Sequence, residues 1–143
     1  MAKGLVAKQA IKIDAPASKV WDALVNPEKV KQYMFGATVA SDWKPGSAIT
    51  FTGEWKGKAY QDKGVIVRAE PRRILEYTHF SPLSGLPDTP DNYHTVTIEL
   101  SEQNQATTLA LSQDNNPNEQ ARQHSEKNWG VMLANLKKVV EQT

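Results

Sequence analysis

The spacing of apolar residues between positions 38 and 115 most constrains the fold of this chain. Apolar and polar residues largely alternate there, as in Val96, Thr97, Ile98 and Glu99. Such alternation predicts strands that are buried on one face only. Turn-forming residues at 44–47, 56–58, 70–72 and 102–105 divide the region into about six strands. We therefore expect an antiparallel sheet with one covered face.

A long helix is expected to follow the last strand. The run from Asn116 to Glu119 has the form of a helix start, with Asn116 as the N-cap and Pro117 in the first turn. Beyond it, apolar residues at helical spacing form one stripe, which comprises Trp129, Met132, Leu133, Leu136 and Val140. Because this stripe must be buried, we expect the sheet to curve around a helix that starts near Pro117.

The N-terminal region predicts one strand and two short helices. Residues 5–14 alternate and indicate a half-buried strand. Pro16 and Pro27 each begin a segment with helical apolar spacing, and Asn26 is suited to cap the second segment. The order of strand, two helices, strands and long helix predicts an α+β fold, organised as a single domain over residues 1–143.

Composition disfavours several classes of function. The 17 Lys and Arg residues nearly balance the 16 Asp and Glu residues, so no net field attracts nucleic acid. The absence of cysteine excludes disulfides and thiolate chemistry, and it is typical of a reducing, cytoplasmic location. No apolar run approaches the roughly 20 residues that cross a bilayer. We expect no metal, no cofactor, no nucleic-acid partner and no membrane span.

Four short motifs, taken in order, are similar to those of a known superfamily. They lie at residues 15–24 (APASKVWDAL), 64–66 (GVI), 73–78 (RILEYT) and 129–136 (WGVMLANL). The chain resembles the START-like, or helix-grip, superfamily, and within it the activator of heat-shock protein 90 ATPase homologue-like proteins. The resemblance implies a curved antiparallel sheet that wraps a long C-terminal helix. It also implies a hydrophobic cavity in many members and activation of a chaperone by the eukaryotic ones.

Two histidines are expected to face each other on the concave face of the sheet. If Tyr77 pairs with Val96 across neighbouring antiparallel strands, His79 lies opposite His94. The two imidazoles are suited to bind a ligand carboxylate or phosphate, to act as acid and base, or to remain solvated without a role. A metal site is disfavoured because the spacing places no third ligand beside them.

The favoured function is noncatalytic binding of a small hydrophobic molecule between sheet and helix, with His79 and His94 as polar anchors. The expected apolar walls are Phe51, Trp55, Tyr77, Val96, Trp129, Met132 and Leu133. A mostly apolar lining with a few polar groups is typical of ligand sites. The pattern leaves open whether these side chains line a cavity or fill it.

A protein partner is the first alternative. Residues 81–91 contain three prolines and form a connection too long for a tight hairpin. Leu83 and Leu86 in this loop are the expected contacts with a partner such as a chaperone, or with the mouth of the cavity if the loop is a lid. The sequence somewhat favours the remaining alternative, a passive surface loop.

A cyclase-like enzyme is the second alternative. It would need an acid–base pair inside the cavity, and only His79 and His94 offer one. The glutamates of three predicted strands, Glu54, Glu76 and Glu99, are all expected on the solvent face. Enzymatic activity is therefore disfavoured.

Overall fold

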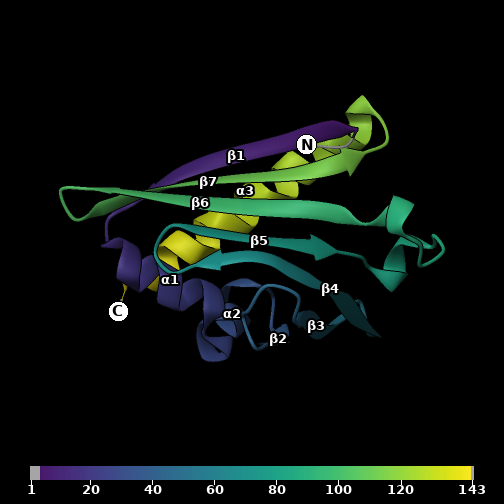
Figure 1. Cartoon of the computed structure of the whole chain (residues 1–143), viewed down its shortest axis with the longest axis horizontal. Helices are drawn as coiled ribbons and strands as arrows, with labels where there is room; N and C mark the ends of the chain where they lie inside the picture. The colour runs from purple at the N-terminus through teal and green to yellow at the C-terminus, as the bar shows by residue number, and fades with distance from the viewer. Residues whose placement is uncertain (1–3, 143) are drawn as a thin grey trace.

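The computed structural model describes residues 4–142, apart from the side chain of Trp55. Within these residues, seven strands form one antiparallel sheet in the spatial order β1-β7-β6-β5-β4-β3-β2 (Figure 1). The elements in chain order are β1 (Leu5–Ile13), α1 (Ala17–Val25), α2 (Pro27–Tyr33), β2 (Thr38–Ser41), β3 (Ala48–Trp55), β4 (Lys58–Glu70), β5 (Ile74–His79), the 3-10 turns η1 (Pro82–Ser84) and η2 (Pro90–Asn92), β6 (His94–Gln103), β7 (Ala106–Asn116) and α3 (Glu119–Glu141). The predicted α+β helix-grip fold is confirmed.

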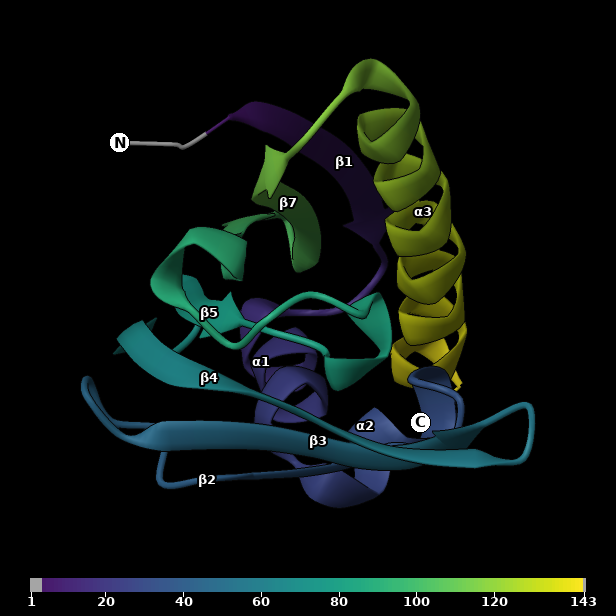
Figure 2. The same ribbon diagram turned by 90° about the vertical axis from the view of Figure 1, so that its right-hand side faces the viewer.

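The sheet curves around α3, and its edge strand β1 lies along the helix. Figure 2 shows α3 running beside the curved sheet, with β1 along its side and α2 near its C-terminal end. The predicted apolar stripe of α3 is buried at Met132, Leu133, Leu136 and Val140. No helix within residues 4–142 is long and apolar enough to cross a membrane.

The predicted start of the long helix is wrong by two residues. The N-cap of α3 is Asn118, whose side chain accepts a hydrogen bond from Ala121 N (2.8 Å), and the helix begins at Glu119. Asn116 instead ends β7, where it pairs with Leu5 of β1, and its side-chain amide donates to Leu5 O (3.0 Å). Pairing with β1 therefore extends the strand through the position expected to cap the helix. The predicted cap at Asn26 is confirmed, since its side chain accepts from the second helix.

Polar side chains of α3 cover the free edge of β1. The backbone N–H of Lys8 donates to Glu126 Oε2 (3.0 Å), and that of Asp14 donates to Glu141 Oε2 (2.7 Å). An uncovered edge strand would expose such groups to pairing with another chain. These bonds also join α3 to the edge of the sheet along the length of β1.

The approach of β4 to β5 requires a glycine at position 64. A Cβ built on Gly64 would lie 1.6 Å from the backbone oxygen of Thr78. Beside it, the backbone N–H of Val65 donates to Thr78 Oγ1 (2.9 Å). The close approach holds the two strands together where Asp62 of β4 meets His79 of β5.

Candidate functional site

The space between the sheet and α3 is almost filled by side chains. A cavity of about 20 Å³ remains beside it, between the sheet and the helices α1 and α2, and Met132 is its one lining residue from α3. It is lined by Leu24, Val30, Tyr33, Met34, Trp43, Ile49, Phe51, Leu75, Tyr77, Ile98 and Met132. A space of this size holds about one water molecule, and apolar cavities of protein interiors are commonly dry. A ligand of any larger size would have to move these side chains.

The outer wall of the cavity is formed by Met34, which follows α2, and by Trp43, in the loop between β2 and β3. Both residues are half-buried. Trp43 has a φ of 59°, and Phe35, which is 61% exposed, has a φ of 55°. This left-handed conformation costs a non-glycine residue about 1 kcal/mol or more, and such strain clusters at sites that clamp ligands or move. The methionine side chain is flexible and adapts its shape, so the outer wall can rearrange more readily than the sheet.

Most of the predicted wall residues are buried between the sheet and α3. Those with buried side chains are Phe51, Tyr77, Val96, Met132 and Leu133. Three of them, Phe51, Tyr77 and Met132, line the cavity, whereas Val96 and Leu133 pack elsewhere in the same core. The rings of Phe51 and Tyr77 are tilted against each other, with centroids 5.8 Å apart. The cavity is therefore bounded on the sheet side by an aromatic pair.

The two predicted tryptophans of the wall differ in what the structure shows. Trp129 is half-buried on α3, and its indole N–H donates a hydrogen bond to Gln113 Oε1 (2.5 Å) on β7. This bond and its packing against the core make Trp129 a link between helix and sheet. Trp55 ends β3, but its side chain lies outside the part of the chain that the structure describes.

The predicted register of β5 and β6 is confirmed, with His79 opposite His94. Each imidazole nevertheless has a partner of its own. His79 Nε2 lies 2.9 Å from Asp62 Oδ2, and His94 Nδ1 lies 2.8 Å from the backbone oxygen of Asp114. Because carboxylate and carbonyl oxygens accept hydrogen bonds, the donor protons are assigned to Nε2 of His79 and Nδ1 of His94. The two rings are oriented by different strands, β4 and β7.

Asp62 is a candidate site residue that the sequence analysis missed. Its Oδ2 atom is bonded to His79, while its Oδ1 atom is buried and has no hydrogen-bond partner among the described residues. Leaving a buried acceptor unpaired carries a free-energy penalty, so such an atom calls for an explanation. The side chain of Asp62 lies on the concave face, where Phe51 is its partner in the β3–β4 register. Asp62 and His79 form a carboxylate–imidazole pair that the sequence analysis did not consider, and neither residue lines the internal cavity.

Two phenols near Asp62 have a raised pKa, mainly because they are buried. Burial, and secondarily the Asp62 carboxylate, raise the pKa of Tyr77 above its usual value of 10.0. The same two causes raise the pKa of Tyr60 on β4. The part of the concave face that carries Asp62 and His79 therefore combines a carboxylate and an imidazole with uncharged aromatic side chains.

Turn geometry was the signal that would have placed Asp62. Lys56 and Gly57 both have positive φ angles, 52° and 80°, as a two-residue hairpin turn requires. This turn pairs Trp55 with Lys58, and the ladder then carries Phe51 opposite Asp62. Counting residue pairs along β3 and β4 away from the turn would have placed Asp62 opposite Phe51 and on the same face.

The loop between β5 and β6 presents both of its leucines to solvent. Leu83 is 40% exposed and Leu86 is 54% exposed. The loop is fastened to β4 by an ion pair between Asp88 and Lys63, and Tyr93 donates its hydroxyl to Asp88 Oδ1 (2.7 Å). A groove of about 590 Å³ separates the loop from β4, and both leucines line it. Neither leucine is among the residues that line the internal cavity.

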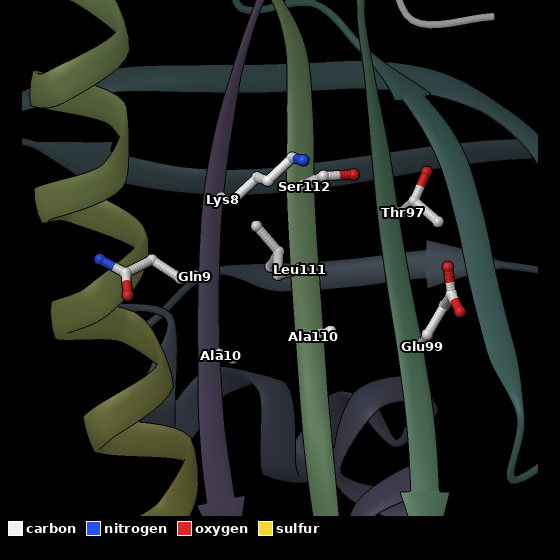
Figure 3. A pocket seen from close by; sticks show the side chains of 8 residues that line it. All are labelled: Lys8, Gln9, Ala10, Thr97, Glu99, Ala110, Leu111 and Ser112. Atoms are coloured by element: carbon white, nitrogen blue, oxygen red, sulfur yellow. The ribbon is translucent and has the colours of Figure 1, made fainter.

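A shallow depression of about 580 Å³ crosses the outer face of β1, β7 and β6. Figure 3 shows its lining, in which Ala10 and Ala110 leave the strands low between longer neighbours, while Gln9 extends toward α3. Thr97 and Glu99 on β6 border it. The depression results from short side chains on the solvent face of the sheet.

Within residues 4–142, no group of three or more His, Asp or Glu side chains is placed to hold a metal ion.

Comparison with known proteins agrees with this architecture. Residues 14–141 match the family described as Activator of Hsp90 ATPase homolog 1-like protein. The chain is similar to the solution structure of ChR145 from Cytophaga hutchinsonii, with 55% identity, a TM-score of 0.85, and coverage of 99% of this chain and 97% of that chain. The chain is also similar to the crystal structure of MLL2253 from Mesorhizobium loti, with 19% identity and a TM-score of 0.78. The match covers 97% of this chain and 98% of that chain. The Aha1 dimer from Colwellia psychrerythraea has 16% identity, a TM-score of 0.73 and coverage of 96% of both chains, so the last two structures show the fold alone. No curated protein matches the chain.

Proposed function

Because the chain belongs to the Activator of Hsp90 ATPase homolog 1-like family and has its helix-grip fold, we propose that it binds a small hydrophobic molecule between the curved sheet and α3. The observation that carries this proposal is the apolar cavity of about 20 Å³, whose outer wall is made by the half-buried Met34 and Trp43. Binding is noncatalytic in this proposal. The cavity as it stands is the closed state of the site.

Opening the site requires movement of the outer wall rather than of the sheet. Met34 follows the last residue of α2, and Trp43 lies in a loop, so neither is held by strand pairing. Met132 faces them from α3 and is a second flexible side chain at the cavity. A ligand that binds only the open state loses apparent affinity in proportion to the closed fraction. We therefore expect modest affinity and a preference for flat or narrow apolar molecules.

The experiment uses the methionine methyl groups as reporters. Two of the three methionines of the chain, Met34 and Met132, line the cavity, so selective ¹³C labelling of methionine methyls observes it directly. The probe is 1-methoxynaphthalene, titrated into the labelled protein. We expect saturable shifts of both methyl resonances. Alanine methyl labelling provides the spatial control, because Ala10 and Ala110 report on the outer depression instead. The proposal is refuted if the Met34 and Met132 resonances do not move when the probe is added up to its solubility limit.

A protein-partner function is the second candidate, and the exposure of Leu83 and Leu86 beside a groove favours it. In this case the chain would stimulate the ATPase of a purified heat-shock protein 90. The double variant Leu83→Asp with Leu86→Asp should lose that stimulation. Leu5→Asp is the matched control, because Leu5 is 41% exposed on a different part of the surface. Equal stimulation by all three proteins, or by none of them, counts against a partner site at this loop.

A further inference from the structure

Asp62 is the one residue within the described chain that carries a buried side-chain oxygen or nitrogen without a hydrogen-bond partner. Its other oxygen, Oδ2, is held by His79 at 2.9 Å, so the carboxylate cannot turn freely to satisfy Oδ1. The side chain is 17% exposed and that of His79 is 26% exposed. The unpaired acceptor is therefore fixed in direction and lies in a partly enclosed place, as preorganised binding groups do.

Phe51 connects this acceptor with the cavity. It lines the cavity together with Tyr77, and it is the cross-strand partner of Asp62. Its ring also meets the ring of His79 edge-on, with centroids 6.1 Å apart. A molecule that enters past Met34 and Trp43 would extend toward Asp62 if the Phe51 side chain turned aside, with the backbone of the sheet unmoved.

We infer that Asp62 Oδ1 accepts a hydrogen bond from a hydroxyl group of the bound molecule, and that the site takes apolar alcohols or phenols. The inference rests on the proposed function. The missing partner must be a donor, because an ionised carboxylate has acceptor sites only. A neutral hydroxyl on an apolar body suits a mainly apolar cavity, since burying a charged donor carries a larger desolvation penalty. His79 acts as a positioning residue that aims the carboxylate.

The experiment compares two probes that differ in one hydrogen-bond donor. 1-Naphthol and 1-methoxynaphthalene share the same aromatic body, but only 1-naphthol donates a hydrogen bond. Their dissociation constants are measured from the Met34 and Met132 methyl shifts. Because a hydrogen bond to a charged group contributes more than one to a neutral group, we expect 1-naphthol to bind about tenfold tighter or more.

Asp62→Asn is the diagnostic variant. The asparagine side chain can still accept from His79 through its oxygen, and it then turns an amide N–H₂ donor toward the position of Oδ1. Both probes carry an oxygen that accepts from this donor, so the preference for 1-naphthol should disappear. Glu99→Gln is the matched control, because it makes the same change of charge at an exposed position on the outer face, and it should keep the preference.

The possible results separate this inference from the proposed function. If both probes shift the two methyls with equal affinity in the wild-type protein, the site binds apolar molecules and Oδ1 is satisfied by water, so the inference fails alone. If the preference persists in Asp62→Asn, the hydroxyl is recognised elsewhere and the inference also fails. If neither probe shifts the two methyls, both proposals fail.

Discussion

Replacing Gly64 by alanine should destabilise the protein far more than the same change at Gly53, although both glycines lie in the paired strands β3 and β4. At position 64 the new Cβ would lie 1.6 Å from the backbone oxygen of Thr78. At position 53 it would lie 2.7 Å from the hydroxyl oxygen of Tyr60, which is the end of a movable side chain. One obstacle is backbone of a neighbouring strand and the other can rotate away.

The magnitude follows from the bonds that must break. Relief of the contact at Gly64 requires β4 and β5 to separate by more than about 1 Å, since heavy atoms that are not bonded rarely approach within 3 Å. The bonds at risk are Lys63 N to Phe80 O (3.0 Å), Phe80 N to Lys63 O (2.8 Å) and Val65 N to Thr78 Oγ1 (2.9 Å). At about 1 kcal/mol for each bond, with some lost packing, Gly64→Ala should lower the free energy of unfolding by about 3–5 kcal/mol.

Urea denaturation followed by tryptophan fluorescence measures this difference. Gly53→Ala should stay within about 1 kcal/mol of the wild type. The reasoning is refuted if Gly64→Ala loses less than about 1 kcal/mol, or if the two variants lose the same amount. If Gly64→Ala does not fold at all, the free energy lost exceeds the stability of the domain, and the ranking of the two variants still holds.

Two further predictions concern α3. Leu136 is fully buried, so Leu136→Ala should lower the free energy of unfolding by about 2–5 kcal/mol. Val131→Ala, on the exposed side of the helix, should change it by about 0.5 kcal/mol or less. Equal losses in urea denaturation would show that the apolar stripe of α3 is not its buried face. Hydrogen bonds from Arg122 lower the pKa of Glu119 from 4.5 to about 2. Because the folded-state pKa lies below the unfolded value, the stabilisation is complete above about pH 4.5 and is lost as the pH falls toward 2. The stability difference between wild type and Glu119→Gln should shrink over that interval, and a difference independent of pH would contradict the assignment.

The sheet could be predicted from the sequence because its signals are local and repeat along the chain. Alternation identified which residues of β5 and β6 share a face, and the assumed pairing of Tyr77 with Val96 then placed His79 opposite His94. The same reasoning could not show which face of residues 64–67 is buried. Val65 and Val67 are apolar yet 44% and 43% exposed on the outer face, so the pattern on β4 looks apolar on both sides.

The site could be predicted only in outline. The pattern identifies which side chains face the interior, but it does not show how completely they fill it, because packing depends on rotamers and on the curvature of the sheet. The misplaced helix cap has a similar cause. Asn116 and Asn118 are both suitable caps, and only the pairing of β7 with β1 decides between them.

The central claim is that an apolar molecule binds between the curved sheet and α3, behind Met34 and Trp43. Titration of 1-methoxynaphthalene into methionine-methyl-labelled protein tests it most directly, since Met34 and Met132 lie on two walls of one cavity. We expect both resonances to move together and to reach saturation with a single dissociation constant. Shifts confined to the alanine methyls of Ala10 and Ala110 would place binding on the outer face and contradict it.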